Sequence, residues 1–90
     1  MKIEFLGGLE LLTNGNKSVF DLQLDGVHVN QLPQIVAQSF LVKDQELFVQ
    51  NGMLQEGILY LVNDADIEIL DDPILKQSDK ITFISMVHGG

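Results

Sequence analysis

The sequence predicts an α+β fold in which a mixed β-sheet wraps over one main helix. Strand-like alternation of apolar and polar residues lies near both ends of the chain, and one stretch with helical periodicity begins near Leu32 between them. The length of 90 residues, 46% of them hydrophobic, is that of one small domain. We therefore expect a single domain over residues 1–86, followed by a flexible tail over residues 87–90.

The N-terminal part predicts an antiparallel hairpin. Apolar and polar residues alternate over residues 2–6 and again over residues 20–25, which is typical of half-buried strands. Gly7-Gly8 ends the first strand, and Asn14-Gly15-Asn16 is a turn signal. The connecting loop also carries three leucines that we expect to pack on the core: Leu9, Leu11 and Leu12.

The main helix is expected to begin after Asn30, whose side chain can cap it, with Pro33 in the first turn. A proline there does little harm because its missing N–H has no partner within the helix. The helix should fade near residues 42–43. Five residues follow the spacing of one helical face: Leu32, Ile35, Val36, Ser39 and Phe40.

The C-terminal half predicts further strands. Residues 44–57 look irregular, and the continuous apolar run Ile58–Val62 is typical of a central strand buried on both faces. Residues 67–70 predict a short strand, and residues 80–86 predict the last one. Strands on both sides of one helix lead us to expect the β-grasp arrangement, with the last strand parallel to the first in the middle of the sheet.

Composition narrows the classes of partner. The net charge is −8, with five lysines and no arginine, so we expect no direct binding to nucleic acid or to acidic membranes. A basic protein partner is favoured by charge complementarity, although acidity also simply keeps small domains soluble. The absence of cysteine and of a signal peptide fits a cytoplasmic protein, and we expect a monomer.

The usual catalytic and metal-binding motifs are missing. An EF-hand loop starting at Asp64 fails because its sixth and twelfth positions hold Ile69 and Leu75. His28 and His88 lack metal-ligand spacing. There is no nucleophile-elbow serine and no phosphate-binding glycine loop. We therefore expect no metal, no bound cofactor and no catalysis by the chain itself.

The remaining chemistry lies at the last residues. Small residues are common at termini for structural reasons alone, but Gly89-Gly90 directly follows a predicted core strand. A free carboxylate is a poor electrophile and must be activated, typically as an acyl-adenylate. Two glycines, which have no Cβ, let the backbone enter a narrow active site and leave the acyl carbon unhindered. Gly90 is thus the candidate acyl carrier, and Gly89 provides access. His88 is either a solvated tail residue or a contact to the activating enzyme.

Four segments, taken in order along the chain, carry a family pattern: Glu4–Gly8, Glu46–Gln50, Gly57–Asp66 and Ile81–Gly90, the last with its His-Gly-Gly end. Together they resemble the ubiquitin-related modifiers of eukaryotic tRNA thiolation. That family usually has Arg-Pro and Trp where this chain has Gln55-Glu56 and Ile67.

The resemblance implies a ubiquitin-like β-grasp fold and a defined reaction at Gly90. A ubiquitin-activating-type adenylating enzyme with a rhodanese domain would consume ATP and convert Gly90 to a thiocarboxylate. A tRNA thiolase complex would pass that sulfur to the wobble uridine of cytosolic tRNAs. The family also becomes attached to lysines of target proteins through an isopeptide bond.

Two other functions stay open at this point. The chain could carry sulfur for molybdopterin or thiamine synthesis, since those carriers share the fold and the Gly-Gly end. Alternatively, it could be a non-covalent ubiquitin-like interaction module. In any of these cases Ile84 and Met86 could face outward and form a binding patch, or they could belong to the core.

Overall fold

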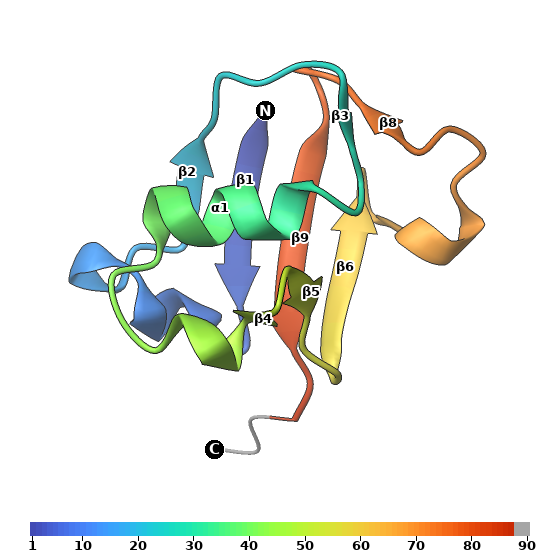
Figure 1. The fold of residues 1–90 in the computed structure, drawn as a ribbon. Helices are drawn as coiled ribbons and strands as arrows, with labels where there is room; N and C mark the ends of the chain where they lie inside the picture. The colour runs from blue at the N-terminus through green and yellow to red at the C-terminus, as the bar shows by residue number, and fades with distance from the viewer. Residues whose placement is uncertain (88–90) are drawn as a thin grey trace.

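The middle of the sheet is formed by the last strand of the chain. The computed structural model describes residues 1–87 and contains a five-stranded sheet in the order β2-β1-β9-β6-β7. Strand β9 pairs in parallel with β1 and antiparallel with β6, as the β-grasp arrangement predicted (Figure 1). The strands of this sheet are β1 (Lys2–Leu6), β2 (Val19–Asp21), β6 (Ile58–Val62), β7 (Ala65–Asp66) and β9 (Lys80–Ser85).

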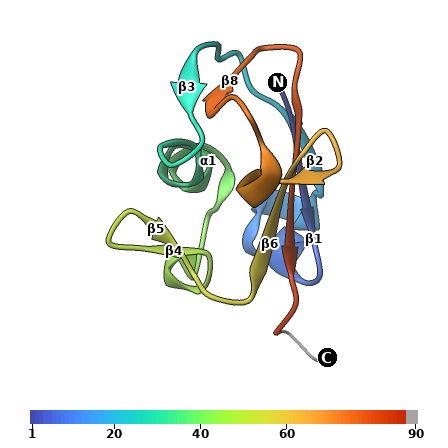
Figure 2. The ribbon, with the colours of Figure 1, turned by 90° about the vertical axis from the view of Figure 1, so that its right-hand side faces the viewer.

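Helix α1 (Leu32–Phe40) lies across one face of the sheet (Figures 1 and 2). Its buried residues include Leu32, Val36 and Ala37, and Pro33 lies in the first turn as predicted. Asn30 is not the capping residue, since the N-cap position is held by Gln31, whose side chain makes no capping hydrogen bond. The helix also ends before residues 42–43, because Leu41 is already extended.

Ser39 follows the spacing of the predicted helical face but does not contribute to the core. It is exposed, and its hydroxyl donates a hydrogen bond to the Ile35 carbonyl at 2.7 Å. Ala37 is buried in its place, next to Val36. A period of 3.6 residues leaves positions at the edge of an apolar face ambiguous, and a hydroxyl there is satisfied by its own helix.

Aromatic side chains fill the space between helix and sheet. The Phe83 ring on the middle strand lies 6.1 Å from that of Phe5, 4.9 Å from that of Phe48 and 4.6 Å from that of Tyr60, measured between ring centroids. The Tyr60 hydroxyl donates a hydrogen bond to the Val29 carbonyl at 2.8 Å, and burial raises the pKa of Tyr60. This bond ties the sheet to the segment that leads into α1.

Two predicted strands differ in the structure. Strand β2 ends at Asp21, so the alternation up to residue 25 does not continue as sheet. Strand β6 is buried on one face only: Tyr60 and Val62 are buried, whereas Leu59 and Leu61 are half-buried on the other face. Antiparallel pairing with one covered face explains this pattern.

The strand predicted at residues 67–70 is wrong. Ile67–Ile69 form a short 3-10 helix, η4, because the Asp66 carboxylate accepts the Glu68 N–H at 2.9 Å and turns the backbone. Two small sheets were not predicted from the sequence. One pairs β3 with β8, and the other pairs β4 with β5. Their strands are β3 (Val27–His28), β4 (Val49–Gln50), β5 (Met53–Leu54) and β8 (Ile74–Leu75).

The loop after β1 contains two 3-10 segments, η1 (Leu9–Leu12) and η2 (Asn14–Asn16). Leu9 and Leu12 are buried, as expected. Leu11 is 44% exposed and does not belong to the core. A third 3-10 segment, η3 (Gln45–Leu47), follows α1.

Replacing Tyr60 with phenylalanine tests the buried hydroxyl. At pH 7 the Tyr60→Phe variant should lose about 1–2 kcal/mol of unfolding free energy, because the Val29 carbonyl loses its donor. The pKa of Tyr60 is raised in the folded protein, so above about pH 10 the unfolded wild-type chain ionises first and the wild type loses stability. The phenylalanine variant has no such loss.

The stability difference between the two proteins should therefore shrink by roughly 1.4 kcal/mol for each pH unit above about 10. Urea unfolding at pH 7, 10 and 11 measures it. A difference that stays constant over this range would show that the hydroxyl is not buried in the folded state.

Candidate functional site

The predicted site residues His88, Gly89 and Gly90 lie outside the described residues, which end at Val87. The site that can be described is the end of the sheet from which they continue. Ser85, the last residue of the middle strand β9, forms this end together with Met86 and Val87, and we call these three residues the tail root (Figure 1). Met86 is 67% exposed and Val87 is 71% exposed, so the side chains at the root of the tail lie largely in solvent.

Gly57 holds one side of the tail root. Its carbonyl accepts the Met86 N–H at 2.7 Å. Its φ of +85° favours glycine, and a Cβ placed on it would collide with the Val87 side chain. Because Gly57 has no Cβ, the chain after β9 can pass close to the start of β6, with Met86 bonded to the Gly57 carbonyl and Val87 beside it.

Gly7 holds the other side. Its φ is +69°, and a Cβ added there would collide with the Ser85 carbonyl oxygen and lie 2.9 Å from the Ser85 nitrogen. Because both contacts are with backbone, no side-chain rotation could relieve them. The sequence predicts Gly7 only as the end of a strand and includes Gly57 only in a family-like segment. Their contacts with the end of β9 appear once β9 is paired with β1 and β6.

The sheet face opposite α1 carries an apolar row next to the same end. The strand register places Leu6 beside Ile84 and Ile84 beside Leu59. Ile84 is half-buried on this face, while the neighbouring Phe83 is fully buried on the other face. Ile84 and Met86 were expected either to face outward or to belong to the core. The structure shows both facing outward, since neither is part of the buried core.

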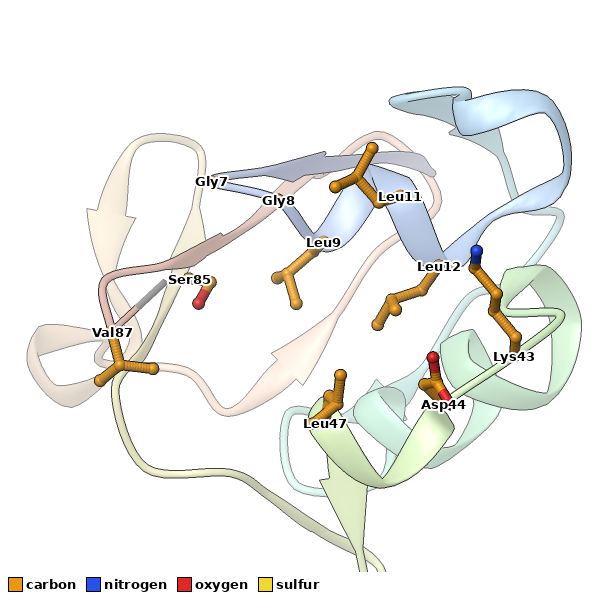
Figure 3. Close-up of a pocket in the computed structure, with 10 residues that line it drawn as sticks. All are labelled: Gly7, Gly8, Leu9, Leu11, Leu12, Lys43, Asp44, Leu47, Ser85 and Val87. Carbon is orange, nitrogen blue, oxygen red and sulfur yellow. The ribbon is translucent and has the colours of Figure 1, made fainter. Parts of the chain in front are cut away.

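An apolar groove of about 320 Å³ opens beside Val87. Figure 3 shows Leu9 and Leu12 pointing into it from one side and Leu47 from the other. Leu47 is 60% exposed. The groove is lined by Gly7, Gly8, Leu9, Leu11, Leu12, Lys43, Asp44, Leu47, Ser85 and Val87.

Backbone hydrogen bonds fix the two walls of this groove relative to each other. The Val42 N–H donates to the Leu12 carbonyl at 2.8 Å, and Thr13 bridges to Leu41. The buried Thr13 hydroxyl lies 2.8 Å from the Glu10 carbonyl and 2.7 Å from the Lys17 carbonyl. The loop after β1 is thereby joined to the segment after α1.

The acidic residues after β6 serve local structure. Asp64 forms an ion pair with Lys80 at 3.0 Å, and this hydrogen bond raises the pKa of Lys80. His28 also has a local role, since its Nδ1 accepts the Asn30 N–H at 3.0 Å within a turn.

Within residues 1–87, no group of three or more histidine and carboxylate side chains is placed to hold a metal ion. In the same range, no helix is long and apolar enough to cross a membrane.

Comparisons with known proteins agree on one family. The family model Urm1 (Ubiquitin related modifier) matches residues 1–90. The mouse protein Ubiquitin-related modifier 1 is 40% identical over 96 residues, covering 100% of this chain and 94% of the mouse protein. The solution structure of Urm1 from Trypanosoma brucei has a TM-score of 0.73 at 38% identity, covering 99% of this chain and 93% of that one.

A more distant structural neighbour shows the fold alone. A chain in the crystal structure of the Amycolatopsis orientalis BexX/CysO complex has a TM-score of 0.71 at 19% identity. The match covers 99% of this chain and 98% of that one. The β-grasp architecture is thus retained at low sequence identity.

Replacing Gly7 with alanine tests the close packing at the tail root. The Gly7→Ala variant should lose about 2–4 kcal/mol of unfolding free energy, because the new methyl group both strains a positive φ and collides with the Ser85 backbone. Gly52→Ala is the matched control, since Gly52 also has a positive φ but has open space around it. The control should lose only about 1 kcal/mol.

Urea unfolding gives both free energies, and amide NMR shifts report the local change. Shifts for Ser85–Val87 should move in Gly7→Ala and stay in Gly52→Ala. Equal losses in the two variants would mean that Gly7 contributes only its backbone conformation.

Proposed function

The chain belongs to the ubiquitin-related modifier family, and we propose that within it the chain acts as a sulfur carrier whose reactive group is the Gly90 carboxylate. An activating enzyme adenylates this carboxylate and converts it to a thiocarboxylate. The observation that supports the proposal most directly is positional. Gly89-Gly90 follows by one residue a tail root whose side chains are exposed and whose backbone is packed between two glycines.

One oxygen of the Gly90 carboxylate attacks the α-phosphate of ATP, and pyrophosphate leaves to form the acyl-adenylate. The outer sulfur of a persulfide on the rhodanese domain of the activating enzyme then attacks the acyl carbon and AMP leaves, which gives an acyl disulfide. A thiol next attacks the enzyme's sulfur atom in this disulfide, so the S–S bond breaks, the Gly90 thiocarboxylate is released and a disulfide is left on the enzyme. The chain itself binds no cofactor in this scheme, since the enzyme holds the nucleotide.

The residues of this chain contribute access and recognition. Glycine at the last two positions leaves the acyl carbon unhindered, because there is no Cβ beside it. The exposed Met86 and Val87 allow an enzyme to approach the tail without unfolding the domain. No cysteine is needed in the chain because the sulfur is carried on the terminal carbonyl.

The thiocarboxylate has two proposed destinations. A separate tRNA thiolase complex passes the sulfur to the wobble uridine of cytosolic tRNAs, and this chain does not bind the tRNA itself. That role accords with a net charge of −8. Alternatively, a lysine amine of a target protein attacks the acyl carbon of the Gly90 thiocarboxylate, and the C–S bond breaks as hydrogen sulfide leaves, which gives an isopeptide bond at Gly90. We propose a cytoplasmic location, because the tRNAs that accept the sulfur are cytosolic.

Intact-mass measurement tests the carrier chemistry. After incubation with ATP, a sulfide source and the activating enzyme, the wild-type mass should rise by the replacement of one oxygen with sulfur, and fragmentation should map it to Gly90. A chain lacking Gly90 should show no change, whereas Met53→Ala, altered at a site 72% exposed and outside the groove, should react like the wild type. An unchanged wild-type mass, beside a control carrier that the same enzyme converts, would contradict the proposal and favour a non-covalent module.

Deletion of Gly90 in cells tests the destination of the sulfur. Cells that depend on the shortened chain should lose tRNA thiolation, measured on isolated tRNA, while the protein keeps its folded circular dichroism spectrum. Retained thiolation would contradict the proposed role. Loss of molybdoenzyme activity or of thiamine synthesis with intact thiolation would instead identify one of the other carrier functions.

A further inference from the structure

The reach of the tail limits where an activating enzyme can touch this domain. Gly90 is three residues beyond Val87. An extended chain spans at most about 3.3–3.6 Å per residue, so the Gly90 Cα lies within roughly 11 Å of the Val87 Cα, whatever conformation the tail adopts. An enzyme that encloses the Gly90 carboxylate must therefore press its surface against the end of the domain that carries Val87.

That end of the domain carries the apolar groove. Val87 forms part of one edge of the groove, and Leu11 and Leu47 expose apolar surface along it. Its volume of about 320 Å³ lies at the lower limit of small-molecule pockets, which run from about 300 to 1,000 Å³. The groove therefore has room for one or two side chains and is small for a nucleotide.

Acyl-adenylates also need protection from water, which favours a close seal where the tail enters the enzyme. An apolar side chain seated in this groove would supply such a seal. Anchors of this kind, large side chains in pockets at the centre of an interface, dominate the binding energy of many complexes. The groove walls are joined by the hydrogen bond from Val42 to Leu12, so they need little reorganisation on binding.

From these observations we propose that the groove receives an apolar side chain, aliphatic or aromatic, that the activating enzyme carries at the mouth of its adenylation site. This inference rests on the proposed carrier function. A second copy of the chain is a poorer occupant, because each copy carries a net charge of −8 and the two would repel. Charged residues in and beside the groove are acidic in excess, which points to basic residues around the anchor on the enzyme. Asp44 and Lys43 line the groove, and Glu10 and Glu46 lie on the η1 and η3 segments that form it.

A double variant of the two exposed leucines tests the groove. In Leu11→Ser/Leu47→Ser, the carrier concentration that half-saturates ATP–pyrophosphate exchange by the activating enzyme should rise at least about tenfold. The rate at saturation should change little, because the reacting carboxylate is untouched. The matched control is Met53→Ser/Ile69→Ser, since both residues are 72% exposed and neither lines the groove. The control should stay within about twofold of the wild type.

Circular dichroism and thermal unfolding of both double variants establish that they are folded; should the first be unfolded, Leu47→Ala alone replaces it. Half-saturation unchanged from the wild type would overturn the groove proposal while leaving the carrier function intact. A variant that changes sedimentation of the free carrier but not its affinity for the enzyme would also overturn it, in favour of self-association. A wild-type carrier that supports neither exchange nor thiocarboxylate formation would overturn the carrier function and the groove proposal together.

Discussion

The parallel pairing of β1 with β9 is the constraint on which the rest of this structure depends. Its register runs from Lys2 beside Lys80 to Leu6 beside Ile84, so the two strands end together at the same edge of the sheet. The loop that leaves β1 and the tail that leaves β9 are therefore neighbours, although they are separated by most of the chain. The glycine contact with the Ser85 backbone, the groove beside Val87 and the exposed tail root all follow from this shared edge.

The main elements of the fold could be predicted because their patterns are long enough. Alternation around Ile3, β-branched and aromatic residues around Phe83 and helical spacing around Val36 each identify one element, and the order of elements gives the topology. Short elements escape this reasoning, since strands of two residues, such as β3 and β8, contain less than one full alternation. Ile67 and Ile69 alternate like a strand, yet the Asp66 side chain bonds the backbone two residues on and produces a 3-10 turn.

The site was only partly predictable for a different reason. Gly89-Gly90 could be proposed from acyl chemistry and from the family resemblance, because both concern consecutive residues, and this assignment stays a prediction. The groove joins Leu11, Leu47 and Val87, whose positions lie far apart in sequence, and no periodicity links them. Gly57 was equally hidden, since a glycine before a strand is common and its contact with Val87 appears only once β6 and β9 are paired.

The central place of β9 has a mechanical consequence. Force on a tail joined to another protein would be transmitted along β9, which is bonded to β1 on one side and to β6 on the other. Since β1 begins beside the start of β9, opposing pulls on the N-terminus and on the tail would slide these parallel strands along each other. The hydrogen bonds between the two strands would then carry the force together rather than break one at a time. The domain should therefore resist mechanical unfolding when it is pulled by its C-terminal tail.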